Sequence, residues 1–170
     1  MALLPILEVP HPLLKAKAEP VRAIDDDIRR LFDDMLETMY KAPGIGLAAP
    51  QVGVSKRLVV VDVAREGEPP RPLKLVNPEI LWRSAETEVA EEGCLSLPDQ
   101  FGDVRRPRSV KLRYLDEQGA EHEIDAEGIL ARCLQHEVDH LDGILFIDHL
   151  SRLKRDMILR RLTKSRRLRA

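Results

Sequence analysis

The sequence predicts an α+β fold in which mostly antiparallel sheets pack around one central helix, with an N-terminal helix and a basic C-terminal helix. Apolar residues recur at helical spacing within residues 25–42 and 128–143. Short runs rich in Val, Ile and Leu lie between these segments. With 170 residues, of which 44% are hydrophobic and 33% charged, the chain is long enough to bury a core as a single domain.

The N-terminal region predicts an extended arm followed by a helix. Four prolines interrupt the first 23 residues, which disfavours a long helix there. Asp25 to Asp27 suit the cap and first turn of a helix, and Pro43 with Gly44 ends it. Six apolar residues between these limits form a helical stripe that we interpret as core: Ile28, Leu31, Phe32, Met35, Leu36 and Met39.

Residues 44–53 form a run of small side chains, Gly-Ile-Gly-Leu-Ala-Ala-Pro-Gln-Val-Gly. Its glycine spacing does not match a dinucleotide-binding loop, and no strand precedes it. Small side chains let another backbone approach closely, and Gln51 adds a long polar side chain near the end of the run. The alternative is a packing loop with a surface glutamine.

Five segments in the middle of the chain predict strands: residues 57–63, 73–77, 80–89, 110–115 and 121–125. The first is largely apolar, as a buried strand is, and three prolines within residues 64–72 indicate a loop after it. The last two are joined by Asp-Glu-Gln-Gly, which predicts a hairpin. Residues 91–98 predict a loop that carries Cys94.

The end of the chain is strongly basic. Ser151 suits the cap of a last helix that carries Leu153, Met157 and Leu162. Residues 151–170 contain nine Lys or Arg and one Asp, a charge of +8, which leaves −10 for residues 1–150 because the whole chain has −2. An acidic body with a basic end indicates an anionic partner such as nucleic acid. A solvated basic helix end is the alternative, and charge alone does not choose between them.

The composition also bears on the compartment. No apolar run approaches the roughly 18 residues that span a membrane. The N-terminus has no basic segment ahead of a long apolar stretch, so no signal peptide is expected. We therefore expect a cytoplasmic protein with no membrane contact, in which Cys94 and Cys133 are thiols rather than a disulfide.

Residues 134–143, Leu-Gln-His-Glu-Val-Asp-His-Leu-Asp-Gly, contain the H-E-x-x-H pattern. On a helix, His136 and His140 lie on one face, one turn apart, and can hold one metal ion. Glu137 can then reach the open side of that ion. The alternative is a surface helix with two titrating histidines.

A catalytic metal site needs a third protein ligand, and the downstream residues offer little. The last position of the extended H-E-x-x-H-x-x-G-x-x-H motif is Phe146, and no glutamate follows Glu137. His149 is available, but it follows an apolar run that we expect to carry the chain away from the site.

Two cysteines are the other candidates. Cys133 lies on the helical stripe of the histidines, but it is about 10.5 Å along the axis from His140, too far for a short side chain to share an ion with it. Cys94 then completes a chemically sound Cys-His-His set with a position left for water. An ordinary core cysteine is the alternative for Cys94.

Three segments together closely resemble the signature motifs of peptide deformylases, in the same order. They are Gly-Ile-Gly-Leu-Ala-Ala-Pro-Gln at residues 44–51, Glu-Gly-Cys-Leu-Ser at 92–96 and Gln-His-Glu-Val-Asp-His-Leu-Asp-Gly at 135–143. The resemblance runs from the proline-rich arm to the basic tail. It implies hydrolysis of the N-formyl group from nascent chains that begin with formyl-methionine, with release of formate.

The resemblance also implies the residues that perform this reaction. It implies one divalent ion per chain, Fe²⁺ as the expected ion in the cell with Zn²⁺ or another divalent ion as alternatives, on three ligands: Cys94, His136 and His140. Glu137 is then the general base and acid. Gln51 and the backbone N–H of Leu95 stabilise the oxyanion.

The resemblance further implies how the formyl-methionyl peptide is held. Ile45 and Gly46 on one side, and the backbone of Glu92 and Gly93 on the other, flank it as an extended strand. The methionine pocket lies beside the motif helix and is lined by Ile45, Ile129 and Cys133. Arg132 and Phe101 lie near its rim.

Residues 1–150 then form the catalytic core, and residues 151–170 form a basic helix continuous with the same domain. That helix resembles the ribosome-docking helix of bacterial deformylases, so the ribosome near its exit tunnel is an expected partner. Two other functions fit the metal motif alone: a general metallopeptidase, and a nucleic-acid-binding protein with a structural metal. The second needs a fourth ligand, and no Cys or His stands at a suitable spacing.

Overall fold

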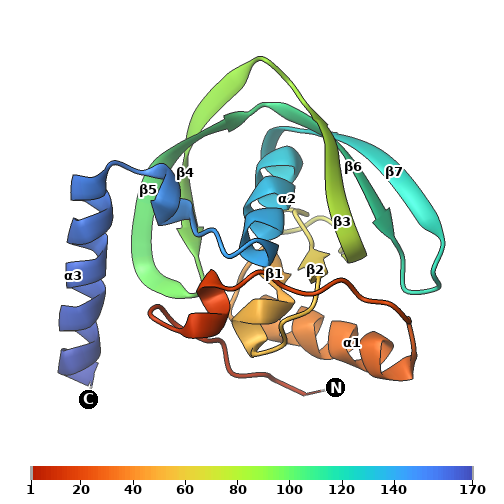
Figure 1. The fold of residues 1–170 in the computed structure, drawn as a ribbon, viewed down its shortest axis with the longest axis horizontal. Coiled ribbons are helices and arrows are strands. Elements are labelled where there is room, and N and C mark those ends of the chain that lie inside the picture. Colours follow the sequence, from red (N-terminus) through yellow and green to blue (C-terminus); the bar gives the residue numbers. More distant parts are fainter. Residues whose placement is uncertain (1, 170) are drawn as a thin grey trace.

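The computed structural model describes residues 2–169, which form three α-helices and seven strands (Figure 1). The helices are α1 (Asp26–Lys41), α2 (Gly128–Leu141) and α3 (Arg152–Arg169). The strands are β1 (Gly46–Ala48), β2 (Leu58–Val61), β3 (Leu73–Arg83), β4 (Thr87–Cys94), β5 (Leu97–Pro107), β6 (Ser109–Leu115) and β7 (Glu121–Glu127). Short 3₁₀ turns lie at η1 (Pro12–Lys15), η2 (Ala49–Val52) and η3 (Phe146–His149).

The strands form two antiparallel sheets. One has five strands in the order β1-β2-β3-β6-β7, and the other consists of β4 and β5. Figure 1 shows α2 in the middle of the molecule, with β4 and β5 on one side and β3, β6 and β7 on the other. The predicted α+β architecture around a central helix is confirmed.

The position of α2 follows from its two kinds of buried residues. Its apolar residues pack on those of β2, β3 and β6 in one cluster: Ala131, Leu134, Val138 and Leu141. His136, Glu137 and His140 are also buried, although they are polar. Buried polar groups need partners, and those of the two histidines come from β4: Glu92 for His136 and Cys94 for His140.

The first helix forms as its sequence predicts. The side chain of Asp25 accepts a hydrogen bond of 3.0 Å from the backbone N–H of Ile28, which caps the helix. Four of the six predicted core residues are buried against β2, and the other two are partly buried there: Ile28, Phe32, Met35 and Met39, then Leu31 and Leu36.

The strand prediction was wrong at residues 80–98. Residues 80–89 are not one strand, because β3 continues to Arg83 and β4 begins at Thr87 after a short bend. Residues 91–98 are not a loop, because β4 reaches Cys94 and only Leu95 and Ser96 turn the chain into β5. No apolar pattern marks β5, since two of its buried side chains, Gln100 and Arg106, are polar.

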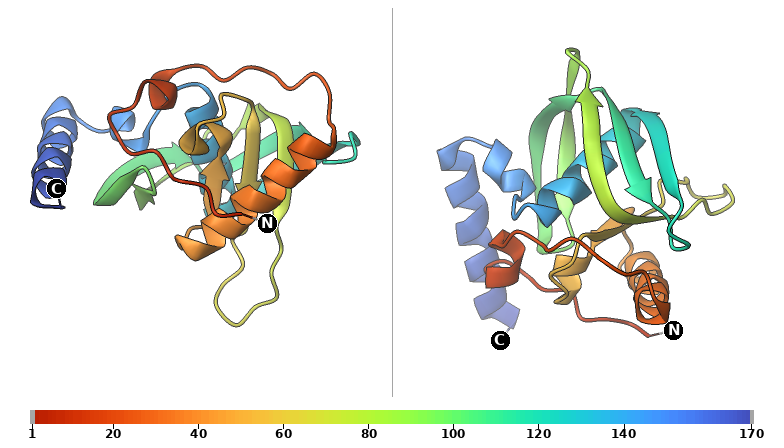
Figure 2. Two further views of the ribbon diagram at one scale, coloured as in Figure 1. Left: turned by 90° about the horizontal axis from the view of Figure 1, so that it is seen from below. Right: turned by 45° about the vertical axis from the view of Figure 1, so that its right-hand side comes forward.

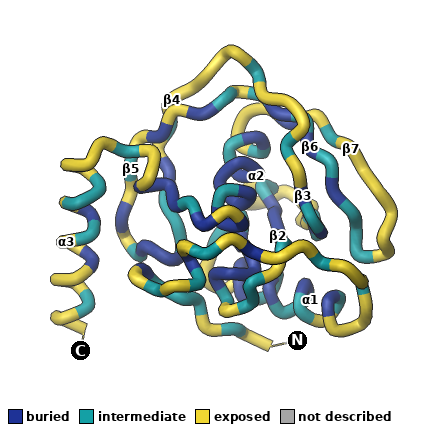
Figure 3. Tube along the Cα trace, viewed as in Figure 1, coloured by how far each residue is buried: buried dark blue, intermediate teal, exposed yellow. Residues whose placement is uncertain are grey.

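The basic helix α3 packs on one side and is exposed on the other. Ile158 and Leu162 are buried against the N-terminal arm, β5 and η3, in a cluster that includes Val9, Leu97 and Phe146. The other faces of α3 are mostly exposed (Figure 3), and the views in Figure 2 show the arm passing beside the helix. Within residues 2–169, no helix combines the length and apolar character that a membrane crossing requires.

Candidate active site

The structure brings the three predicted metal ligands together. Cys94 comes from the end of β4, and His136 and His140 come from successive turns of α2. Their donor atoms all lie within 4.8 Å of one another, and Cys94 Sγ is 3.3 Å from His140 Nε2. Bonds of 2.0–2.3 Å to a tetrahedral ion would separate donors by about 3.5 Å, so the spacing suits one shared ion.

The chemistry of this donor set also fits a divalent cation. Burial, followed by the charges of His136 and Arg106, lowers the pKa of His140 well below its usual value, which favours the neutral imidazole that a metal ligand must be. Burial opposes protonation of His136 as well, but its interactions with Cys94 and Glu92 outweigh burial and raise its pKa; a bound cation would compete with that proton. A thiolate and two imidazoles are ligands that borderline and soft divalent ions accept. The residues therefore fit a single divalent metal ion with one position left open.

Glu137 lies beside these ligands and is itself buried. Within the described part of the chain, its Oε1 atom has no hydrogen-bond partner. Burial raises the pKa of Glu137 to about 7; the charge of His136 opposes this rise, and that of Glu92 adds to it. A cation bound nearby would lower this pKa again. A carboxylate with such a pKa can both accept and return a proton near neutral pH.

Gln51 is 2% exposed, so the surface-glutamine alternative is wrong. Its Oε1 accepts a hydrogen bond of 3.0 Å from the backbone N–H of Ala48. Its Nε2 donates to Ser96 Oγ at 3.1 Å and lies 3.5 Å from Cys94 Sγ. The amide N–H₂ group is therefore held beside Cys94, a predicted metal ligand. Leu95 follows Cys94 directly in the turn between β4 and β5.

A cavity of about 1120 Å³ opens next to this cluster. It is bordered by β1, an outer strand of the larger sheet, and by β4, whose only partner among residues 2–169 is β5. It is lined by all six residues expected to contact substrate: Ile45, Gly46, Glu92, Gly93, Ile129 and Cys133. Arg132 and Phe101, expected at the rim, line it as well.

The side chain of Glu92 has a role that the sequence analysis did not find. It is turned away from solvent, with Oε1 2.9 Å from Nδ1 of His136, and it accepts two hydrogen bonds from Arg106, of 2.6 and 2.9 Å. Burial would raise the pKa of Glu92, but the hydrogen bonds from His136 and Arg106 outweigh it and lower the pKa to about 2. The carboxylate thus fixes the orientation of His136, one of the three predicted metal ligands. Residues two apart on a strand point to the same face, so the position of Cys94 could have indicated that the side chain of Glu92 faces the same cluster.

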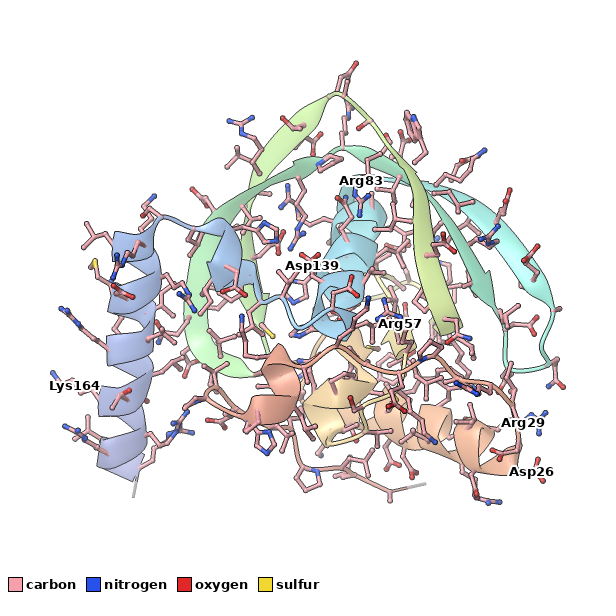
Figure 4. All side chains as sticks on the ribbon, viewed as in Figure 1. Asp26, Arg29, Arg57, Arg83, Asp139 and Lys164 are labelled. Carbon is pink, nitrogen blue, oxygen red and sulfur yellow. The ribbon has the colours of Figure 1, made fainter. Side chains whose placement is uncertain are left out.

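Two further residues extend this network to the surface. Arg106 also donates to Asp139 Oδ2 at 2.9 Å, and Asp139 lies 2.8 Å from Nε2 of His149. Figure 4 labels Asp139 on the side of α2 next to η3. His149, considered as a downstream ligand, therefore contacts Asp139 and does not belong to the Cys-His-His cluster.

The family model described as polypeptide deformylase matches residues 3–156. The chain belongs to the peptide deformylase family. A peptide deformylase of Phenylobacterium zucineum is 60% identical over 164 residues, 96% of this chain and 97% of that protein. One of Rhizobium meliloti is 55% identical over 169 residues, 99% of this chain and 97% of that one.

Solved peptide deformylases have the same fold. The enzyme of Legionella pneumophila superimposes with a TM-score of 0.92 at 45% identity and covers 99% of this chain and 98% of its own. The peptide deformylase of Ehrlichia chaffeensis in complex with actinonin also has a TM-score of 0.92, at 44% identity, and the match covers 97% of this chain and 98% of that one. As a peptide deformylase, this chain removes the N-formyl group from nascent polypeptides.

Proposed function

We propose that Cys94, His136 and His140 hold the divalent ion and that Glu137 moves the protons of the deformylation reaction. The observation that carries this assignment is the position of Glu137: a buried carboxylate, with one oxygen that has no partner among residues 2–169, directly follows one member of the Cys-His-His cluster. When bound, the ion supplies Lewis acidity and lowers the pKa of a water molecule at the site.

The side chains then divide the remaining chemistry. Glu137 takes a proton from the attacking water and gives one to the methionine nitrogen as the C–N bond of the formamide breaks, so that formate and a free amine leave. Nε2 of Gln51 and the backbone N–H of Leu95 donate hydrogen bonds to the oxygen of the formyl group as negative charge develops on it. The anchoring of Gln51 by Ala48 and Ser96 supports this role, because it fixes the donor before substrate arrives.

The test of this assignment is the substitution Glu137→Ala, with formate release from formyl-Met-Ala-Ser and the metal content measured on the same sample. We expect kcat to fall by about 10²–10⁴-fold, the usual contribution of a general acid–base group, while the metal is retained. Glu123→Ala, which removes an exposed glutamate on β7, is the matched control. Full activity of Glu137→Ala would contradict the proposal.

We propose Fe²⁺ as the ion in the cell, with Zn²⁺ and other divalent ions as replacements. The donor set supports either metal, since one thiolate and two imidazoles suit both. Oxidation of iron or of Cys94 would make the Fe²⁺ form oxygen-sensitive. We expect iron in anaerobically purified protein and a shorter half-life of activity in air than under nitrogen. Equal half-lives together with a zinc content would contradict this assignment.

The substrate is proposed to lie extended between β1 and β4 as an added strand. Gly46 and Gly93 keep these two edges free of side chains, and the apolar pocket beside α2 receives the methionine side chain. Ile45 and Ile129 are 44% and 57% exposed, so they have apolar surface that a methionine can cover. Substitution of the methionine by aspartate in formyl-Met-Ala-Ser is expected to raise KM, and an unchanged KM would argue against this pocket.

The exposed face of α3 is proposed to bind the ribosome, which places the enzyme in the cytoplasm with nascent chains. Its exposed basic side chains support an RNA contact, and Lys164 points away from the body in Figure 4. Deleting α3 is a poor test, because it also removes the buried Ile158 and Leu162. Replacing Arg160, Arg161 and Lys164 by glutamine is expected to weaken salt-sensitive ribosome binding while turnover of a short peptide is kept. Equal losses of both would contradict the docking role.

A further inference from the structure

We propose that Arg132 is a positioning residue that holds β4 against α2 and so fixes the width of the groove in which an extended substrate lies. This inference rests on the proposed binding of the peptide between β1 and β4. The contacts of one guanidinium carry it. Nη1 donates to Glu92 Oε2 at 2.6 Å and to the backbone carbonyl of Val104 at 2.9 Å, and Nη2 donates to the carbonyl of Glu88 at 2.8 Å. One side chain of α2 thus contacts both strands of the smaller sheet.

The strand β4 has few other attachments. Of its eight residues only Glu92 is buried, and its only strand partner within residues 2–169 is β5. β5 is anchored independently, because Leu97 and Val104 belong to the core cluster beneath α3. A two-stranded sheet is marginally stable by itself. The contacts of Arg132 therefore determine how closely the outer half of β4 approaches the helix.

The contact with Glu88 lies where it can affect substrate residues beyond methionine. Cys94 marks the metal end of β4, and Glu88 is six residues earlier, about 20 Å along an extended strand. Ala90 and Glu88 both line the cavity. A peptide with its formyl group at Cys94 passes these residues only with the positions that follow methionine. Displacement of this part of β4 weakens the binding of long substrates more than that of short ones.

Arg132 does not itself recognise substrate by charge. Its side chain is 14% exposed, and its Nη atoms donate to three protein oxygens. Arg106 is the natural comparison, since it also binds Glu92. Arg106 has its other contact with Asp139 on α2 and makes no hydrogen bond with Glu88 or Val104 among the described residues. The two arginines thus share one carboxylate and differ in their contact with the backbone of the smaller sheet.

The experiment compares kcat and KM for formyl-Met amide and formyl-Met-Ala-Ser in wild type and Arg132→Leu. We expect wild type to have a higher kcat/KM for the longer substrate than for the shorter one. In Arg132→Leu this ratio is expected to fall about tenfold because KM for the longer substrate rises, which is the effect of losing hydrogen bonds from a charged group. The metal content of each sample is measured. Arg108→Met is the matched control, because the side chain of Arg108 contacts the exposed carboxylates of Glu86 and Glu88, at 3.6 and 3.2 Å, and not the backbone carbonyl of Glu88. Its substrate preference is expected to equal that of wild type.

Two further variants keep the result decisive. Arg132→Lys keeps a charge beside Glu92 but cannot reach both carbonyls, so we expect its preference for the longer substrate to lie between those of wild type and Arg132→Leu. If Arg132→Leu does not fold, Arg132→Lys tests the role of Arg132 in its place. Arg106→Lys weakens the contacts with Glu92 and Asp139 but leaves those of Arg132 with the backbone of β4 and β5, so we expect metal loss with the length preference kept. If Arg132→Leu loses the same factor in kcat/KM on both substrates, the proposed role of Arg132 is overturned, whereas the proposed groove is not. A wild type without any preference for length overturns the proposed groove as well.

Discussion

Gly46 lies against the carboxylate of Glu137 with no space for a side chain between them. A Cβ atom on residue 46 would overlap Oε2 of Glu137 and come within 2.9 Å of Sγ of Cys133. Both neighbours are buried on α2, and the carboxylate of Glu137 would have to shift to admit this atom. The glycine of β1 therefore fixes the position of the proposed general base across the cavity.

The substitution Gly46→Ala is expected to act through Glu137. The added methyl group displaces the carboxylate, and a misplacement of about 1 Å can lower kcat by about 10²-fold. The three atoms nearest to this Cβ position belong to Glu137 and Cys133 and not to the proposed metal ligands, so the metal content is expected to stay at the wild-type level. Formate release and metal analysis check both expectations.

A double-mutant cycle identifies the cause of that loss. In a Glu137→Ala background no carboxylate remains to be displaced, so adding Gly46→Ala is expected to change kcat little. Independent, multiplicative losses would show that Gly46→Ala acts by another route, such as contact with substrate.

The Cys-His-His cluster was accessible to sequence reasoning because two of its residues follow helix periodicity. The third followed from the poor fit of the other candidates, together with the deformylase resemblance. The partners of Glu92 were not accessible, because Arg106 lies on a strand that the sequence did not reveal. Which side chains of β4 and β5 meet α2 is decided by strand pairing and packing, and a local pattern does not contain that information.

The burial of Gln51 has a similar origin. The run of small residues correctly indicated close approach of another backbone, which is the N-terminal arm: the N–H of Leu7 donates to the carbonyl of Gln51 at 2.7 Å. The sequence predicted the arm and the run separately. Only tertiary structure brings the two together and covers the glutamine.

The substitution Gln51→Glu tests the proposed oxyanion donor without removing the side chain. A carboxylate can still accept the hydrogen bond from Ala48, but it has no N–H₂ group to donate. We expect kcat to fall by about 10²–10³-fold, as for the loss of one oxyanion donor. Ser96→Ala is the control, because it removes one acceptor of Gln51 Nε2 and keeps the donor; its loss is expected to be much smaller. Wild-type kcat in Gln51→Glu would argue against the role.

Alanine substitutions at Gly143 and Gly119 can be compared to test how closely the N-terminal arm approaches Gly143. Both have positive φ angles, of 74° and 84°, which alanine adopts only with strain. A Cβ on Gly119 would have no neighbour closer than 4.0 Å, whereas one on Gly143 would overlap the carbonyl of Lys15. We expect Gly119→Ala to lower the free energy of unfolding by about 1 kcal/mol and Gly143→Ala by clearly more, because the arm must also move. Urea unfolding at constant metal saturation measures both, and equal losses would contradict the close approach of the arm.

Tyr40 is expected to make stability depend on pH in the alkaline range. Tyr40 is 45% exposed, and its partial burial, followed by the hydrogen bond of 2.6 Å to Asp62 and the charge of that carboxylate, raises its pKa from 10.0 to about 12. Between these values the unfolded chain has lost the phenolic proton and the folded chain keeps it, so stability falls as pH rises. The contribution is complete below the unfolded pKa and is lost as the pH passes the folded one.

Tyr40→Phe removes this titration and the hydrogen bond together. The difference in free energy of unfolding between wild type and Tyr40→Phe is therefore expected to be constant up to about pH 9 and to shrink as pH rises from about 10 towards 12. Other groups that titrate in this range, such as lysines, are present in both proteins and cancel in the difference. Urea unfolding of both proteins across this range is the measurement. A difference that does not change with pH would mean that Asp62 does not hold the phenolic proton in the folded protein.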